Sequence, residues 1–514
     1  MEEYLTLILN KNRINVNREK LASKSCYFAS LFSHNFSDSH NKEHTINYDI
    51  ALHTLQNFVQ WVHHEDCVYI DCHSIKVSMT KFMQDNFIEL LNLLQLSILF
   101  VVDELTNDII DIIVLCWLLP EKVIDIWLLA QELSIKILQD ICLSVCLDQF
   151  DNLPQSLLFE LPAENIIQLI GNDNVRSNTD YLNYIRSGWI EHHVLSDIVD
   201  IKERRQPKFI QGTVIYETDE KGIMAAYLYT WDGNALCKCV QLHSIQYPGE
   251  WLTGMQVVAR GFSVYTVGGE LRLENGHFNE IISRYCLLSK KWYYQARLKV
   301  PRRHMITVFI GNKLLVVGGV GIYRLKFGTV YILDIHTGMW TRGAGAPENF
   351  SEVPPHVVVN ECLIFLKSSI HIYWLKYDCW ITQRLHCRLS KQIIATLTSD
   401  TTFLITGNDV DEMILTRIDI AKEDFDCEEG ECLKEDVDRI VMARIKPIRI
   451  GHSVWYTIRF LLVSGIGVMM LTPVYDEYKY VHAHTIIRKD YTRTVIPKSY
   501  CFKIMDPCSL YSTV

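Results

Sequence analysis

The chain has 514 residues, of which 49% are hydrophobic and 21% are charged, and its formal net charge at pH 7 is −10. This length is enough for about three domains of ordinary size. The negative charge is spread along the chain without a basic block, which argues against nucleic acid or an anionic membrane as the main partner.

The sixteen cysteines do not by themselves indicate a secreted disulfide framework. The first residues, Met1-Glu2-Glu3, are acidic, and the apolar run at residues 4–9 is too short for a signal peptide. The cysteines are therefore expected to be reduced thiols, and the protein to be cytoplasmic, with nuclear and cytoskeletal locations left open. The apolar stretch at residues 90–102 is followed by Asp103, and no uncharged run reaches the length of a membrane span.

The N-terminal region predicts a hairpin followed by helices. Residues 4–9 and 14–16 are short extended runs separated by a polar stretch. Residues 19–32 predict one amphipathic helix, because apolar and small residues recur at spacings of three and four. Residues 52–62 predict a second helix, and the apolar stretch at residues 87–102 completes the core of this region.

The string Leu-Ala-Ser-Lys-Ser-Cys-Tyr-Phe at residues 21–28, placed after a hairpin, resembles the early part of a BTB/POZ domain. In family members that bind cullin-3, a hydrophobic residue and a Glu two positions later follow this helix. Phe36, Ser37 and Asp38 match that motif, with Asp in place of Glu. The resemblance implies that these three residues bind cullin. The alternative is that Phe36 packs under a loop and Asp38 caps the next element.

Homodimerisation through this region is a weaker expectation than cullin binding. Many members of the family exchange an N-terminal helix across the dimer, and the residues before Tyr4 do not match that helix.

Residues 123–193 predict one helix after another, with Pro154 and Pro162 at the turns. The series resembles a BACK domain through an early helix with Trp and Ala, a Leu-Ile-x-x-Asp-x-Val step at residues 169–175, and a helix that contains Trp189-Ile190. The charged residues 200–207, which end in a proline, predict a linker.

The second half of the chain contains a repeat. One apolar run ends in Gly268-Gly269 and another in Gly318-Gly319, so equivalent glycines lie 50 positions apart. Such runs predict buried strands whose ends need positive φ and a close approach of backbone.

A spaced pair of large side chains follows each run, with six residues between its members. The pairs are Tyr285 with Trp292, Leu333 with Trp340, and Tyr373 with Trp380. They are expected to pack between neighbouring sheets. The third pair follows a run that ends in Lys367-Ser368 instead of two glycines.

A period near 50 with these residues resembles kelch motifs. The residues that carry this resemblance are Gly268, Gly269, Tyr285, Trp292, Gly318, Gly319, Trp340, Tyr373 and Trp380. Residues 209–216, 227–229, 403–407 and 460–465 predict strands of more degenerate copies, which gives about six blades. An unrelated all-β sandwich is the alternative.

Together the three resemblances predict a multidomain fold: an α+β BTB/POZ domain at residues 1–119, an all-α BACK domain at 120–200, a linker at 201–207, and an all-β six-bladed kelch β-propeller at 208–505. This is the domain order of kelch-like proteins. The resemblance implies a substrate-recognition adaptor of a cullin-3 RING E3 ubiquitin ligase, with cullin-3 and a protein target as partners. The alternatives are an actin-associated or other cytoskeletal scaffold, and a pseudo-adaptor that sequesters cullin or a target.

Propellers bind partners through loops that a rigid scaffold presents. Arg and Tyr are enriched in binding hot spots, and Arg can clamp carboxylates. The candidate substrate-binding residues are Arg272, Asn275, Arg302, Arg303, Tyr323, Arg324 and Arg449. The alternative for Arg303 and Arg449 is that they join adjacent blades through backbone hydrogen bonds.

No catalytic residue, cofactor or metal is predicted. The sequence has no Gly-x-Ser-x-Gly elbow, phosphate loop or dinucleotide fingerprint. The histidine pairs at 63–64 and 192–193, and the pair Cys427 and Cys432, lack a complete set of metal ligands.

Overall fold

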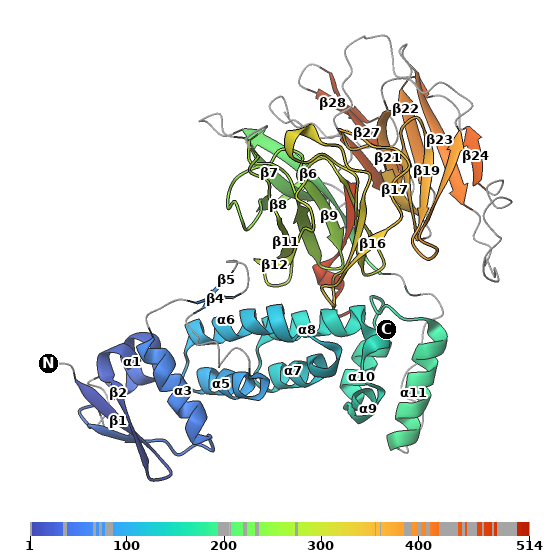
Figure 1. Ribbon diagram of the computed structural model, residues 1–514. Helices are drawn as coiled ribbons and strands as arrows, with labels where there is room; N and C mark the ends of the chain where they lie inside the picture. The colour runs from blue at the N-terminus through green and yellow to red at the C-terminus, as the bar shows by residue number, and fades with distance from the viewer. Residues whose placement is uncertain are drawn as a thin grey trace. The chain divides into compact units, whose positions relative to one another are not determined.

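The computed structural model describes residues 3–33, 39–64, 68–70, 75–77, 86–193, 205, 207–218, 224–231, 236–272, 276–354, 356–359, 361–384, 393–398, 402–407, 412–420, 440–444, 448–449, 460–464, 467–474, 477–480 and 501–512. The chain divides into two compact units (Figure 1). The first unit comprises Met1–Lys208, Leu288–Tyr294 and Pro507–Val514, and the second comprises Phe209–Leu287 and Gln295–Asp506. Each unit is described by itself below.

The first unit begins with the predicted hairpin. Strands β1 (Tyr4–Leu9) and β2 (Asn12–Asn17) pair antiparallel, and β3 (Glu43–Thr45) pairs parallel with β1. Asn10 and Lys11 form the turn with φ of 48° and 71°. Two consecutive left-handed residues match the twist of a two-residue hairpin, so the prediction is confirmed.

The single helix predicted for residues 19–32 is wrong. Two helices, α1 (Arg18–Lys24) and α2 (Cys26–Leu31), meet at Ser25, whose backbone is extended with φ −125° and ψ 118°. Ser25 Oγ accepts a hydrogen bond from the Phe28 amide at 3.2 Å and donates one to the Phe100 carbonyl at 2.6 Å. A serine that bonds to backbone in this way starts a new helix instead of continuing the old one.

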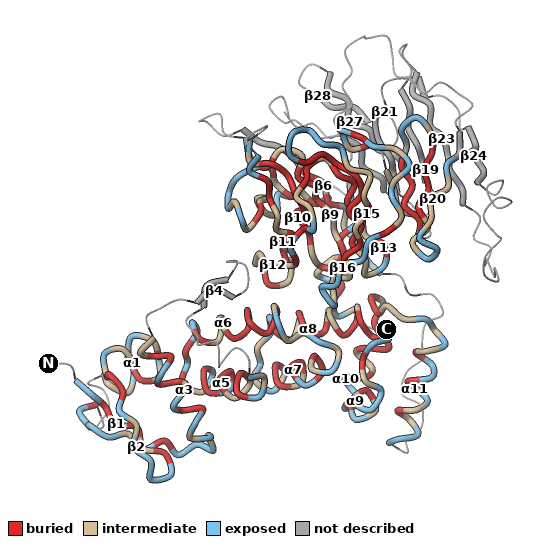
Figure 2. The backbone as a smooth tube through the Cα atoms, viewed as in Figure 1, coloured by how far each residue is buried: buried red, intermediate tan, exposed pale blue. Residues whose placement is uncertain are grey.

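The rest of the first unit is mainly helical, as the patterns at residues 52–62, 87–102 and 123–193 predict. Its further elements are α3 (Leu52–His63), β4 (Val68–Ile70), β5 (Ile75–Val77), α5 (Phe87–Leu99), α6 (Asp103–Ile112), the π-helix η1 (Ile113–Trp117), α7 (Pro120–Glu132), α8 (Lys136–Asp148), η2 (Phe150–Asn152), α9 (Gln155–Glu160), α10 (Ala163–Ile170) and α11 (Thr179–His193). Buried residues lie along helices α5, α7 and α8 (Figure 2). Phe28 and Phe58 pack their rings against Phe100 at centroid distances of 5.0 and 5.4 Å, which joins α2, α3 and the end of α5 into one core.

A segment near the C-terminus belongs to the first unit, which the sequence did not predict. The segment contains η5 (Pro507–Ser509) and Leu510, which is 1% exposed. Asn172 Nδ2 donates to the Leu510 carbonyl at 2.9 Å, and Asn174 Nδ2 donates to the Ser509 carbonyl at 2.8 Å. Both amides come from the Leu-Ile-x-x-Asp-x-Val step, so this step anchors the segment.

The second unit contains, in its described part, six separate antiparallel sheets, except that the first residues of strand β12 (Lys291–Tyr294) are assigned to the first unit. Their strands are β6 (Phe209–Thr218), β7 (Met224–Trp231), β8 (Leu236–Leu242) and β29 (Cys501–Met505); β9 (Gln256–Arg260), β10 (Ser263–Val267), β11 (Ile281–Cys286) and β12 (Lys291–Arg297); β13 (Ile306–Ile310), β14 (Lys313–Val317), β15 (Val330–Asp334) and β16 (Trp340–Gly343); β17 (His356–Val359), β18 (Cys362–Leu366), β19 (Ser369–Trp374) and β20 (Cys379–Arg384); β21 (Ile393–Thr398), β22 (Thr402–Gly407), β23 (Glu412–Ile420), β24 (Ile440–Arg444) and β25 (Ile448–Arg449); and β26 (Phe460–Ser464), β27 (Gly467–Val474) and β28 (Glu477–Tyr480). The strands predicted at residues 209–216, 227–229 and 403–407, and at 460–464 of the segment 460–465, are present.

Neighbouring sheets contact one another through the strand at one edge of each. Strand β29 contacts β9, β9 contacts β13, β13 contacts β17, β17 contacts β21, and β21 contacts β26. The sheets thus follow one another side by side. The pair Cys427 and Cys432 lies outside the described residues.

The glycine pairs have the predicted backbone. The φ values are 62° and 98° at Gly268 and Gly269, and 64° and 93° at Gly318 and Gly319. A Cβ atom on Gly268 would lie 2.5 Å from the carbonyl oxygen of Arg302, so only glycine fits at that position. The Gly269 amide donates to the same carbonyl at 2.9 Å. The glycine pair of one sheet is therefore packed against the segment that enters the next sheet.

Tyr373 and Trp380 pack between sheets, as predicted. They face each other across β19 and β20 with ring centroids 4.9 Å apart. Both contact a core that includes Val308 and Leu315 of the preceding sheet. Trp380 Nε1 donates to the Ala344 carbonyl at 2.9 Å. Such an indole buries apolar area and satisfies its one donor at the same time.

The other aromatic residues of the repeat lie on the expected strands. Trp340 of β16 is partly buried against a core that includes Tyr265 and Val267 of the preceding sheet. Tyr285 on β11 is 8% exposed, and Trp292 on β12 is half-buried.

Candidate partner-binding loops

The predicted cullin-binding residues, Phe36, Ser37 and Asp38, lie outside the described residues, as does Asn275. Arg449 ends strand β25, and its side chain is also outside the described part. The remaining candidates, Arg272, Arg302, Arg303, Tyr323 and Arg324, belong to one region of the second unit.

This region contains two connections, the β10–β11 connection at residues 268–280 and the β14–β15 connection at residues 318–329, and the segment with Arg302 and Arg303 that precedes β13. Each of the two connections starts with a glycine pair. The next residue, Glu270 or Val320, forms an isolated β-bridge with Thr253 or Arg303, respectively. The two bridges occupy equivalent positions of the repeat, because Arg303 lies 50 positions after Thr253 and Val320 lies 50 positions after Glu270. The repeat therefore includes the bases of these two loops.

A buried ion pair joins the two loop bases. Arg303 Nη1 lies 2.6 Å from Glu270 Oε2, and the two side chains are 8% and 2% exposed. The other oxygen, Glu270 Oε1, accepts a hydrogen bond from the Gly276 amide at 3.0 Å. The backbone of Arg303 pairs with Val320 in both directions, at 2.9 and 2.8 Å. One carboxylate thus holds its own loop and the base of the next.

Arg302 has a similar supporting role. It is fully buried, and its Nη1 donates to the Gly318 carbonyl at 2.9 Å and to Thr329 Oγ1 at 3.1 Å. Its guanidinium lies 4.7 Å from the centroid of the Phe327 ring, within range of a cation–π contact. Burial lowers the pKa of Arg302 to about 10.

The prediction that Arg302 and Arg303 contact a substrate is therefore corrected. The structure turns both guanidinium groups inward, where they bond to the loops instead of facing a partner. For Arg303 the alternative stated above, a link between neighbouring sheets, describes the structure better, although the link runs through a carboxylate as well as backbone.

The β14–β15 loop presents apolar side chains to solvent. Tyr323 is 99% exposed, Leu325 is 60% exposed and Ile322 is 49% exposed. All three lie in or beside η3 (Ile322–Arg324). Arg324 and Lys326 of the same loop are exposed too. Sequence reasoning selected Tyr323 and Arg324 but missed Ile322, Leu325 and Lys326.

This loop has an unusual backbone. Tyr323 and Arg324 are consecutive left-handed residues with φ of 56° and 59°. For residues other than glycine this conformation costs about 1–2 kcal/mol each. Hydrogen bonds hold it in place, from the Gly321 amide to the Leu325 carbonyl at 2.9 Å and from the Phe327 amide to the Gly319 carbonyl at 2.9 Å. In this conformation the Tyr323 side chain is 99% exposed.

The β10–β11 loop adds one exposed cation, Arg272. The Leu271 amide donates to the His277 carbonyl at 2.9 Å, which closes the loop above Glu270. Arg272, Tyr323 and Arg324 thus come from two loops with a shared, braced base.

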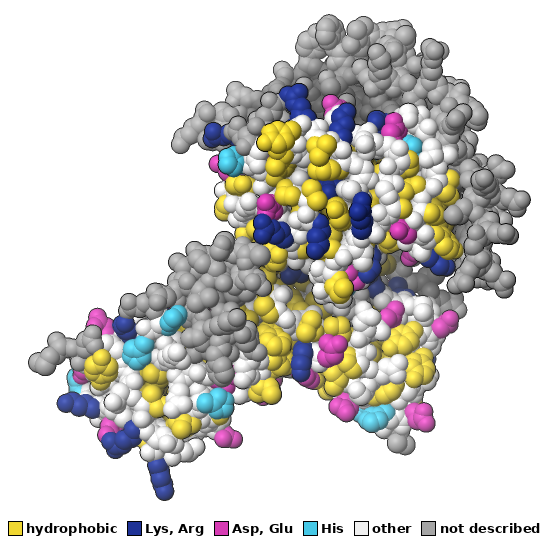
Figure 3. Space-filling model, viewed as in Figure 1, with side chains coloured by type: hydrophobic (Ala, Val, Ile, Leu, Met, Phe, Trp, Pro, Cys, Tyr) yellow, Lys and Arg dark blue, Asp and Glu magenta, His cyan; other side chains and the backbone are white. Residues whose placement is uncertain are grey.

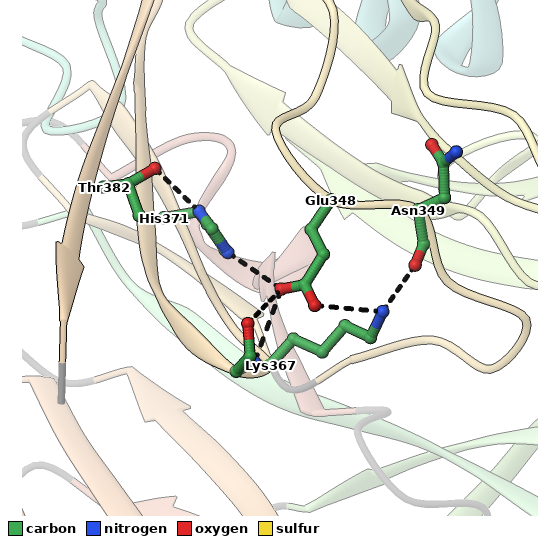
Figure 4. A network of polar contacts seen from close by, with 6 residues as sticks. Glu348, Asn349, Lys367, His371 and Thr382 are labelled. Atoms are coloured by element: carbon green, nitrogen blue, oxygen red, sulfur yellow. Dashed lines mark hydrogen bonds and ion pairs between the residues drawn. The ribbon is translucent and has the colours of Figure 1, made fainter.

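The sheet of strands β17–β20 lacks the glycine pair and carries a polar network in its place (Figure 4). Glu348 Oε2 accepts a hydrogen bond from Ser368 Oγ at 2.8 Å and lies 3.0 Å from His371 Nε2. Glu348 Oε1 lies 3.2 Å from Lys367 Nζ. His371 Nδ1 lies 3.0 Å from Thr382 Oγ1.

The order of hydroxyl, imidazole and carboxylate in this network is also that of a nucleophile relay. However, Thr382 is simply the residue opposite His371 in the β19–β20 register, and the carboxylate is shared with Ser368 and Lys367. The arrangement ties the β18–β19 turn to the segment before β17. We interpret it as a structural substitute for the glycine pair.

The network makes stability depend on pH. Burial raises the pKa of Glu348, but hydrogen bonds from Ser368, His371 and Lys367 outweigh it and lower that pKa from 4.5 to about 2. The stabilisation is therefore complete above about pH 4.5 and is lost as the pH falls from there toward 2. We expect the free energy of unfolding, measured by urea titration, to fall between pH 5 and pH 2 by about 1–2 kcal/mol more for wild type than for Glu348→Gln. Parallel pH profiles for the two proteins would contradict this assignment.

Within the part of the chain that the structure describes, no group of three or more His, Cys, Asp or Glu side chains is placed to hold a metal ion. His63 Nε2 accepts a hydrogen bond from the Asn17 amide at 3.0 Å, and His193 Nε2 lies 2.8 Å from the Phe159 carbonyl. No described helix has both the length and the apolar character needed to cross a membrane.

No protein-family model matches the chain. No curated protein sequence matches it at a significant level.

Proposed function

We propose that the chain is a substrate-recognition adaptor of a cullin-3 RING E3 ubiquitin ligase, acting in the cytoplasm. In this proposal residues 1–119 form a BTB/POZ domain that binds cullin-3, and residues 120–200 form a BACK domain. Residues 208–505 form a kelch β-propeller that binds a protein target.

The observation that carries the proposal is the structural repeat of the second unit. The glycine pairs have positive φ and pack against the entry to the next sheet, and Trp340, Tyr373 and Trp380 pack between sheets. Edge strands of successive sheets contact one another in chain order. Successive antiparallel sheets that contact one another through edge strands are typical of β-propeller architecture. The hairpin, the α1–α2 pair and the helices up to α11 precede it in the order that the resemblance requires.

The proposed role needs no bond-making chemistry in this chain. An adaptor holds a target close to the ubiquitin-charged partner of the ligase and so raises the effective concentration of the reacting groups. The β10–β11 and β14–β15 loops supply a surface suited to binding a target, because the Glu270–Arg303 ion pair fixes their base and their exposed side chains are aromatic and basic.

The test is binding of the full chain to the isolated N-terminal domain of cullin-3, measured by calorimetry. We expect a submicromolar Kd for wild type and a loss of about tenfold or more for Phe36→Ala, because a buried aromatic anchor dominates such interfaces. Asp38→Ala should weaken binding less. Tyr184→Ala is the matched control: it removes a 54% exposed aromatic side chain of α11, and its Kd should equal that of wild type.

Absence of binding at tens of micromolar would reject the adaptor role and place the cytoskeletal scaffold first. If Phe36→Ala and Tyr184→Ala lowered the affinity for cullin-3 equally, the assignment of residues 36–38 as the cullin-binding motif would be rejected.

A further inference from the structure

We propose that the β14–β15 loop recognises an acidic peptide segment in which carboxylate side chains flank an aliphatic or aromatic residue. This inference names the class of target for the proposed function and rests on it only in calling the peptide a target.

The loop displays apolar side chains to solvent. Ile322, Tyr323 and Leu325 are exposed within four consecutive positions, although the loop is bonded to the body of the second unit on both sides. Isolated exposed apolar residues are ordinary, but a contiguous group rimmed by charges indicates an interaction site. Tyrosine also loses little conformational entropy on binding.

The loop also carries positive charge. Residues 321–327 read Gly-Ile-Tyr-Arg-Leu-Lys-Phe and include two cations and no acid, in a chain whose net charge is −10. Arg324 and Lys326 alternate with Tyr323 and Leu325, so positive and apolar groups are interleaved. Figure 3 shows basic and hydrophobic side chains next to one another on the face of the second unit in view. Carboxylates that alternate with apolar residues complement this pattern.

The backbone of the loop is preorganised by hydrogen bonds. The left-handed backbone of Tyr323 and Arg324 is held by the Gly321–Leu325 and Phe327–Gly319 hydrogen bonds and by the buried Arg302 beneath Phe327. Strain of this kind persists where the surrounding structure fixes it, and it is concentrated at functional sites. A loop already fixed in its binding conformation loses less entropy when a peptide binds.

The probe is a phage-displayed library of random twelve-residue peptides, selected on the immobilised full chain. Recovered peptides should be enriched in Asp and Glu on both sides of Leu, Ile or Phe. Binding of the most enriched peptide, measured by fluorescence anisotropy, should weaken at least about tenfold for Tyr323→Ser and by about three- to tenfold for Arg324→Ala. Raising salt from 50 to 500 mM should weaken it further, because the charge contacts are exposed.

The matched control is Tyr377→Ser. Tyr377 is 39% exposed and follows Lys376 in the β19–β20 turn, so it is another Tyr next to a cation in the same unit. Its variant should bind the peptide as wild type does. Because Tyr323 is 99% exposed, its replacement is not expected to disturb folding, and circular dichroism checks this.

A charge reversal, Arg324→Glu with Lys326→Glu, should shift the selected peptides from acidic to basic. Failure to enrich any peptide, enrichment without an acidic bias, or equal loss in Tyr323→Ser and Tyr377→Ser would each overturn the proposal. Peptide selection needs no cullin, so its failure can be told apart from failure of the adaptor role, which the cullin-3 titration reports independently.

Discussion

Replacing Arg303 by Met should destabilise the second unit by about 3–5 kcal/mol. The substitution keeps an unbranched apolar stem but removes the guanidinium group, so Glu270, which is 2% exposed, loses its ion-pair partner at 2.6 Å. Removing one partner of a buried pair carries this large cost because the remaining charge stays desolvated. The free energy of unfolding would be measured in urea, with near-UV circular dichroism as the probe.

The control is Arg297→Met. Arg297 pairs with Glu280 in the same unit, but these side chains are 69% and 34% exposed. An exposed pair contributes about 0–1 kcal/mol, so this variant should unfold close to wild type. If the two variants lost the same stability, the brace assigned to Glu270 and Arg303 would have to be abandoned. Arg303→Met should also weaken binding of the selected acidic peptide, since it loosens the base of the loop.

The second large effect is expected for Gly268→Ala, at about 3 kcal/mol. Gly268 has φ of 62°, and a Cβ atom would lie 2.5 Å from the Arg302 carbonyl oxygen and 2.4 Å from Met305 Cε. The left-handed conformation costs about 1–2 kcal/mol in alanine, and the backbone contact adds to it because a carbonyl cannot move aside as a side-chain end can.

Gly261→Ala separates these two contributions. Gly261 has a similar φ of 56°, but nothing lies within 4 Å of the position of its Cβ. Its substitution should therefore cost only about 1 kcal/mol in the same urea experiment. The difference between the two variants measures the close approach of neighbouring sheets at the glycine pair. A difference near zero would show that the repeat needs glycine for φ alone.

The features that the sequence could predict are those with a local cause. A glycine pair after an apolar run has few explanations, so the positive φ at Gly268 and Gly318 followed from the residues themselves. The hairpin before α1 likewise depends only on its two-residue turn and flanking strands.

The features that were missed depend on partners far away in the chain. Ser25 ends a helix because its hydroxyl reaches the Phe100 carbonyl, 75 positions later. Arg303 was predicted to bind a partner because no local pattern in the sequence indicates its ion pair with Glu270. Lys367 stands where the other copies have glycine, and its role depends on the ion pair with Glu348, which lies 19 positions earlier in the chain. For the loop, composition indicated Tyr323, but its exposure follows from a backbone turn that sequence pattern does not specify.

The pairing of β29 with β6 has a consequence for synthesis of the chain. Strands β6, β7 and β8 are made by residue 242, but the strand that completes their sheet begins only at Cys501. At about 5–20 residues per second, the ribosome needs on the order of ten to fifty seconds to deliver it. During that interval the edge of β6 is a row of unpaired amides and carbonyls, open to strands of other chains. The risk of aggregation through this edge therefore lasts until β29 has been synthesised and has paired with β6.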